Sequence, residues 1–94
     1  MIILDTNVIS ELMRAEPAPQ VLAWIKGQAG SSLFTTTLSQ AEILYGLALL
    51  GEGERREALQ AAARAMFETD FADRILSFDT TAAPIYAQIA VARR

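Results

Sequence analysis

The stretch MIILDTN, residues 1–7, is a short apolar run that ends abruptly in a carboxylate and an amide. Four apolar residues in a row, with β-branched Ile2 and Ile3 among them, are typical of a strand covered on both faces, as in a parallel sheet. Asp5 then lies at the carboxyl end of this strand. Ligands of open α/β sheets bind in the crevice beyond the carboxyl ends of the strands, so Asp5 is a candidate functional residue.

Length and hydropathy limit the class of protein. Ninety-four residues make one domain at most, and 52% of them are hydrophobic, which predicts a folded core. We therefore expect a single domain over residues 1–94. No apolar run is long enough to span a bilayer, so we expect a cytoplasmic protein without a membrane partner.

The chain contains no cysteine and no histidine. This excludes disulfides, thiolate metal sites, and the usual general base and zinc ligand. Chemistry must then rely on carboxylates, hydroxyls, amides and arginines, an inventory that suits hard cations such as Mg²⁺ or Mn²⁺. The net charge of −3 argues mildly against nucleic-acid binding through the protein's own field, but not against a substrate held through a bound metal.

Beyond the first strand, helices and strands alternate with short connections. The β-prone stretches at 32–36 and 75–78 predict two further strands. Together with a strand at 1–5, they predict an α/β fold with a parallel sheet flanked by helices. The helix at 38–50 is apolar nearly all the way round, which predicts that it is mostly buried. The last helix is expected to turn Ile85, Tyr86 and Ile89 inward.

Asp5 also has a structural interpretation, because Asp, Thr and Asn can all cap a helix. Asn7 immediately precedes the helix expected from Val8 and can cap it, which leaves Asp5 without a structural role. A buried carboxylate without a partner is costly. Asp5 is therefore expected to be protonated, paired across the fold, or bound to a cation.

Glu42 is the second candidate, because it is the only charged residue between Lys26 and Glu52. The start of its helix fits a capping box formed by Thr37 and Gln40. Glu42 can complete an overlapping box with the serine three residues before it, or can point at the crevice beside the first strand. An arginine bridging Glu42 to the first acid would exclude the second alternative.

The other charged residues have ordinary explanations. Arg55 and Arg56 are expected on the solvent side of an amphipathic helix, with a docking role as the alternative. Asp79 follows the third strand, but capping of the last helix explains it, so we place it outside the site.

Three parts of the sequence resemble the PIN domain, and most closely the VapC and FitB toxins of bacterial type II toxin–antitoxin systems: ILDTNVISE at 3–11, LSQAEILYG at 38–46, and RILSFD at 74–79 with IYAQI at 85–89. The resemblance implies a three-layer fold and a metal-dependent endoribonuclease that cleaves RNA phosphodiester bonds. It implies that Asp5 and Glu42 are metal-binding and catalytic residues, with Mg²⁺ or Mn²⁺ as cofactor. Thr6 and Asn7 are expected to support Asp5 by local hydrogen bonds.

The same resemblance implies that the chain corresponds to the N-terminal two thirds of the family's domain, because the family's third acid lies on a helix beyond Arg94. We therefore expect half a metal site, and an open apolar edge at the first strand that the missing C-terminal segment, a separate fragment or another chain would cover. Family members form homodimers and hetero-oligomers with a cognate antitoxin, which inhibits them.

Two alternatives remain open. A truncated, non-catalytic fragment would keep only dimer and antitoxin-binding surfaces. A phosphoryl-transfer enzyme of the haloacid dehalogenase kind would use Asp5 as a nucleophile. Asn7 in place of a second aspartate argues against that enzyme, as does Lys26, the only lysine available for phosphate.

Overall fold

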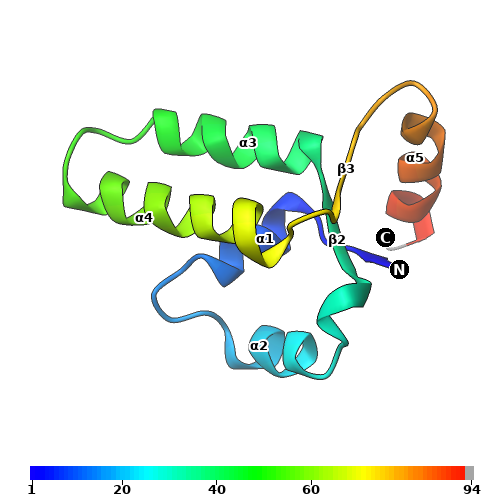
Figure 1. Ribbon diagram of the computed structural model, residues 1–94, viewed down its shortest axis with the longest axis horizontal. Helices are drawn as coiled ribbons and strands as arrows, with labels where there is room; N and C mark the ends of the chain where they lie inside the picture. Colours follow the sequence, from blue (N-terminus) through cyan, green and yellow to red (C-terminus); the bar gives the residue numbers. More distant parts are fainter. Residues whose placement is uncertain (93–94) are drawn as a thin grey trace.

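The computed structural model describes residues 1–92, without the side chains of Tyr86 and residues 89–92. Short parallel strands lie at the centre, with helices around them (Figure 1). The elements in chain order are β1 (Ile2–Ile3), α1 (Thr6–Leu12), α2 (Pro19–Lys26), η1 (Gly30–Ser32), β2 (Leu33–Thr36), α3 (Thr37–Ala48), α4 (Glu54–Ala65), η2 (Met66–Asp70), β3 (Ile75–Leu76) and α5 (Ala82–Ala92). The predicted α/β fold is confirmed, with strands shorter than expected.

The sheet has the order β1-β2-β3, and both pairs are parallel. The first half of β2 pairs with β1, with Ile2 opposite Leu33, and its second half pairs with β3, with Thr36 opposite Leu76. Because the strands run the same way, their carboxyl ends point toward one edge of the sheet. That edge is where α1 and α3 begin.

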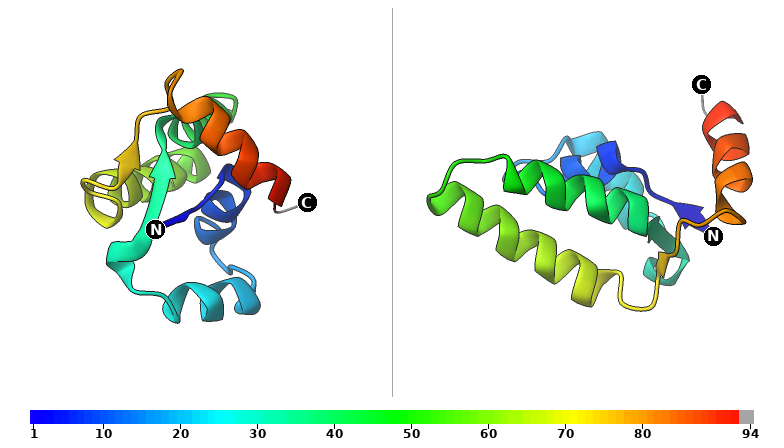
Figure 2. Two further views of the ribbon diagram at one scale, coloured as in Figure 1. Left: turned by 90° about the vertical axis from the view of Figure 1, so that its right-hand side faces the viewer. Right: turned by 90° about the horizontal axis from the view of Figure 1, so that it is seen from above.

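Helices α3 and α4 lie side by side and antiparallel, and they extend away from the strands (Figures 1 and 2). Helix α1 packs against α3, while α5 stands on the other side of the strands from the α3–α4 pair (Figure 2). The core is formed where α1, α3, η2 and the strands meet. Its buried residues are Leu4, Ile9, Leu33, Ile43, Leu47, Ala63, Phe67 and Phe71.

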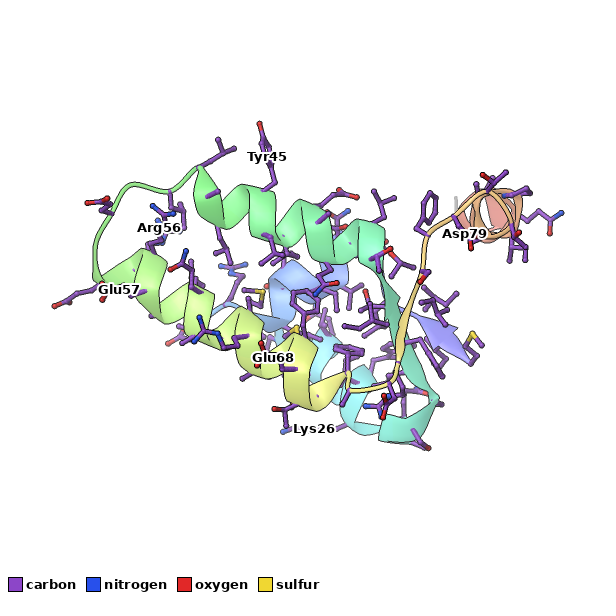
Figure 3. The ribbon with its side chains drawn as sticks, turned by 45° about the horizontal axis from the view of Figure 1, so that its top comes forward. Lys26, Tyr45, Arg56, Glu57, Glu68 and Asp79 are labelled. Carbon is purple, nitrogen blue, oxygen red and sulfur yellow. The ribbon has the colours of Figure 1, made fainter. Side chains whose placement is uncertain are left out.

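The expectation that α3 is mostly buried is wrong. Only one stripe of the helix, Ser39, Ile43 and Leu47, is buried. Leu44 is 51% exposed and Tyr45 67% exposed, and Tyr45 points away from the body of the molecule (Figure 3). The reason is that α3 packs against α1, α4 and β2, which cover one side of it.

Two further expectations concern the ends of the chain. In the described part of the sheet, β1 is an edge strand that pairs with β2. The side chain of Leu4 is nevertheless buried, so the open apolar edge expected there does not include it. Ile85 is 55% exposed, which contradicts its inward placement, while the side chains of Tyr86 and Ile89 are outside the described residues. None of the described helices has both the length and the hydropathy to cross a membrane.

Candidate functional site

Asp5 is the residue that caps α1. Its backbone is extended, and its Oδ1 accepts a hydrogen bond of 3.0 Å from the Val8 N–H. The prediction that Asn7 caps this helix is therefore wrong, because the helix begins at Thr6 and the cap position falls on Asp5. The bond holds one carboxylate oxygen of Asp5 in place. The other oxygen has no hydrogen-bond partner among the described residues.

Glu42 has no capping role. The cap of α3 is Thr36, whose hydroxyl accepts a 3.1 Å hydrogen bond from the Ser39 N–H. The predicted box at Thr37 is wrong, since β2 runs directly into α3 and its last residue takes the cap position; the Thr37 hydroxyl accepts instead from the Phe78 N–H at 2.9 Å. Glu42 is thus in the second turn. Its exposed carboxylate has no hydrogen bond or ion pair to a described residue.

A hydrogen bond between side chains brings the two acid-bearing segments together. The Thr6 hydroxyl, next to Asp5, donates to the Ser39 hydroxyl at 3.2 Å. Glu42 follows Ser39 by three residues and lies roughly on the same side of α3. We had expected Thr6 to form local hydrogen bonds, but it bonds across the fold instead. This bond places the start of α1 beside the part of α3 that carries Glu42.

A cavity of about 860 Å³ opens between α1, α3 and α4. Thr6, Ser10 and Glu42 line it, together with Arg14, Glu16 and mainly apolar side chains from α3, α4 and the segment that follows α1. Asp5 is outside this lining and adjoins it through Thr6. Arg55 also lines the cavity although it is exposed, whereas Arg56 lies outside that lining and is half-buried, so neither has the purely solvent-facing role expected for both.

Neither acid forms an ion pair with a described residue. Within the part of the chain that the structure describes, the one ion pair joins Arg14, just after α1, to Glu11 at 3.2 Å. No arginine bridges Asp5 and Glu42 in that part. Arg14 and Arg55, which line the cavity together with Glu42, form no ion pair with it.

The chemistry of these donors fits a hard divalent cation, because all of them are oxygens. Their number is small: the described residues hold no group of three or more acidic, histidine or cysteine side chains that could share a metal ion. Asp5 and Glu42 could each supply a carboxylate. Mg²⁺ keeps most of its waters and needs few protein ligands, so two carboxylates are a weak site but a chemically suitable one.

The sequence analysis missed the buried hydroxyls of this region but was correct about Asp79. Thr35, Thr36 and Ser39 are buried hydroxyls at the end of β2 and the start of α3. Their signal in the sequence is the run of three threonines, residues 35–37, at the end of an apolar strand. Asp79 caps α5 as expected, with its Oδ1 accepting from the Ala82 N–H at 2.9 Å, and it lies beside α5 (Figure 3).

Comparison with known proteins gives one family. The profile of the PIN domain matches residues 2–94. Over 89 residues, 95% of this chain, the sequence is 44% identical to the plasmid stability protein StbB of Pseudomonas syringae, 43% identical to a VapC ribonuclease of Sinorhizobium fredii, and 40% identical to the toxin FitB of Neisseria gonorrhoeae. The chain spans 64% of the length of each relative.

Solved structures give the same result. The fold matches a structure of FitAB bound to an IR36 DNA fragment with a TM-score of 0.79 and 40% identity, covering 95% of this chain and 62% of that one. It also matches a crystal structure of FitAcB from Neisseria gonorrhoeae with a TM-score of 0.70 and 36% identity, covering 97% of this chain and 66% of that one.

Proposed function

Because this chain belongs to the PIN-domain family, we propose that it supplies Asp5 and Glu42 to the active site of a metal-dependent endoribonuclease. We propose further that the protein is the toxin of a bacterial type II toxin–antitoxin system. The family relationship supports the reaction class, and the similarity to VapC and FitB supports the toxin role.

One observation carries the proposal. The Thr6–Ser39 hydrogen bond sets the start of α1 against α3, so Asp5 and Glu42 belong to touching segments. Glu42 has no structural task among the described residues, and no basic side chain there pairs with either acid. Two acids without an ion-pair partner, one just after β1 and the other in the second turn of the helix that follows β2, suit a cation site at this edge of the sheet.

The residues have distinct tasks in this proposal. The Val8 N–H orients the Asp5 carboxylate, whose second oxygen is left to face a ligand. Glu42 would be the second ligand or would orient the attacking water. When bound, a divalent cation supplies charge neutralisation at the phosphate and activation of water. Further acids from the rest of the family's domain would complete the site.

The proposed partners follow from the same relationships. They are an RNA substrate, a cognate antitoxin that inhibits the protein, and a second copy of the toxin. A segment equivalent to the remaining third of the relatives, in the same or another chain, would complete the domain. The solved FitAB and FitAcB structures, which resemble this chain, support an assembly of this kind.

The second candidate is a non-catalytic binding module. Two observations favour it: the largely apolar lining of the α1–α3–α4 cavity, and the lack, among the described residues, of a third acid that could share a metal ion with Asp5 and Glu42. The haloacid dehalogenase-like alternative is wrong, because the family that matches residues 2–94 is the PIN domain.

An RNA cleavage assay with Mg²⁺ or Mn²⁺ tests the proposal. We expect metal-dependent cleavage that is lost in Asp5→Asn and Glu42→Gln. Asp79→Asn is the matched control, because it changes another helix-capping aspartate to the same amide, at a place beside α5. Cleavage that survives in Asp5→Asn would refute the assigned site. If the chain binds an antitoxin but cleaves no RNA, the second candidate describes it.

A further inference from the structure

Three polar side chains are buried in the described part of the molecule, and all three are hydroxyls within residues 35–39, the segment that joins β2 to the turn of α3 that carries Glu42. Thr35 is 0% exposed, Ser39 2% and Thr36 5%. A buried hydroxyl is unfavourable unless it is hydrogen-bonded, and each of these has a partner. Packing alone does not explain these hydroxyls, because an alanine or valine side chain would fill the same space.

Two of these hydroxyls are bonded to the residues on either side of Asp5. The Thr35 hydroxyl donates to the carbonyl of Leu4 at 3.1 Å, and the Ser39 hydroxyl accepts from Thr6 at 3.2 Å. The backbone before and after Asp5 is thus fastened to a single segment, residues 35–39. That segment leads directly into the turn that carries Glu42.

The third hydroxyl fixes the start of α3. By accepting from the Ser39 N–H, Thr36 sets the residue at which the helix begins and hence the direction in which each later side chain leaves it. A helix that began one residue later would turn Glu42 by about 100° around the helix axis. The three hydroxyls together relate the position of Asp5 to the orientation of Glu42.

We propose that Thr35 and Ser39 are positioning residues for the acid pair: they set the separation of Asp5 and Glu42 and contact neither metal nor substrate. The inference rests on the proposed function, because the separation of Asp5 and Glu42 affects binding only if the two acids share one metal ion. Mutating a group that holds a metal ligand in place typically lowers metal affinity tenfold or more. The argument applies to carboxylate ligands as it does to histidine ligands, because both must be held in the correct orientation.

Variants at Thr35 separate the hydroxyl from the shape of the side chain. Thr35→Val keeps the shape and removes the hydrogen bond to Leu4, whereas Thr35→Ser keeps the hydroxyl and removes a buried methyl group. A purely structural role predicts that metal affinity follows the free energy of unfolding in both variants. A positioning role predicts that metal affinity follows the hydroxyl.

The experiment measures Mn²⁺ binding to the 94-residue chain by calorimetry, and the free energy of unfolding without metal by urea titration. We expect the Mn²⁺ dissociation constant to rise about tenfold in Thr35→Val and Ser39→Ala, and to stay within about twofold of wild type in Thr35→Ser. Ser32→Ala is the control, because the Ser32 hydroxyl donates to the Ala29 carbonyl at 2.6 Å just before β2, at the opposite end of that strand from the acids. It should bind Mn²⁺ as wild type does.

The outcomes are distinguishable. If Thr35→Val and Ser39→Ala bind Mn²⁺ as wild type does while Asp5→Asn loses binding, the positioning role is overturned and the proposed function stands. Equal losses in Ser32→Ala would also overturn it, because the effect would then be general. If the wild-type chain takes up no Mn²⁺, the assignment of Asp5 and Glu42 as a cation site in this chain fails, and the inference falls with it.

Discussion

Asp5 has two separable tasks, capping α1 and supplying a charge, and two substitutions tell them apart. Asp5→Ala removes both the hydrogen bond from the Val8 N–H and the carboxylate. Asp5→Asn removes only the charge, because asparagine caps helices about as well as aspartate. We therefore expect different losses of stability from the two variants and the same loss of metal response.

The magnitudes follow from the cap. Losing an N-cap costs about 1 kcal/mol of unfolding free energy, whereas replacement by Asn should cost little because Asn and Asp cap helices about equally well. For a chain of this size, about 1 kcal/mol corresponds to a fall in Tm of roughly 4–8 °C. Mn²⁺ at ten times its dissociation constant stabilises the folded state by about 1.4 kcal/mol. It should therefore raise the Tm of the wild type by at least as much as the loss of the cap lowers it, roughly 4–8 °C or slightly more.

Differential scanning fluorimetry with and without Mn²⁺ measures both effects. Asp5→Asn should melt close to the wild type without metal and should show no Mn²⁺ shift. Asp79→Ala, which removes the cap of α5, should leave the Mn²⁺ shift intact. A full Mn²⁺ shift in Asp5→Asn would show that Asp5 is not a ligand, and equal melting of Asp5→Ala and Asp5→Asn would refute the capping argument.

Three further predictions concern the fold and are checked by urea unfolding. Leu47→Ala should lose about 2–5 kcal/mol, whereas Leu44→Ala on the exposed face of the same helix should stay within about 0.5 kcal/mol; equal losses would contradict the one-sided burial of α3. Gly53→Ala should lose about 1–3 kcal/mol because the φ of Gly53 is +146°, while Gly51→Ala, with open space around its Cβ, should be nearly neutral. Arg74→Ala should lose about 1.5–3 kcal/mol, because its guanidinium donates to backbone carbonyls of β2 and η2; an unchanged midpoint would refute this.

The sequence was a good guide wherever the signal was local. Apolar runs located all three strands, and the abrupt end of the first one located Asp5. The capping residues were misassigned by one or two positions, because Asp, Thr and Asn are all capable caps and only the backbone decides which one is used. The mistake mattered at Asp5, where capping coexists with the proposed ligand role.

Other features depended on distant contacts. The apolar character of α3 does not reveal which of its faces the neighbouring elements cover. The prediction of a mostly buried helix was therefore wrong for Leu44 and Tyr45, which are exposed. The roles of Thr35 and Ser39 depend on partners 31 and 33 residues away in the chain. No local pattern encodes such bonds: Thr35 and Thr36 were interpreted only as β-prone residues, and Thr37 as a helix cap.

Strand β2 pairs with β1 through its first half and with β3 through its second half, and this arrangement affects the order of folding. Helices α3 and α4 are neighbours in sequence and can associate early, whereas each strand pair must close a loop of some thirty residues or more, a slow step. The bonds around Asp5 belong to the slow class. A nascent or partly folded chain would therefore form its helical hairpin before Asp5 and Glu42 come together, so the proposed active site would be assembled late in folding.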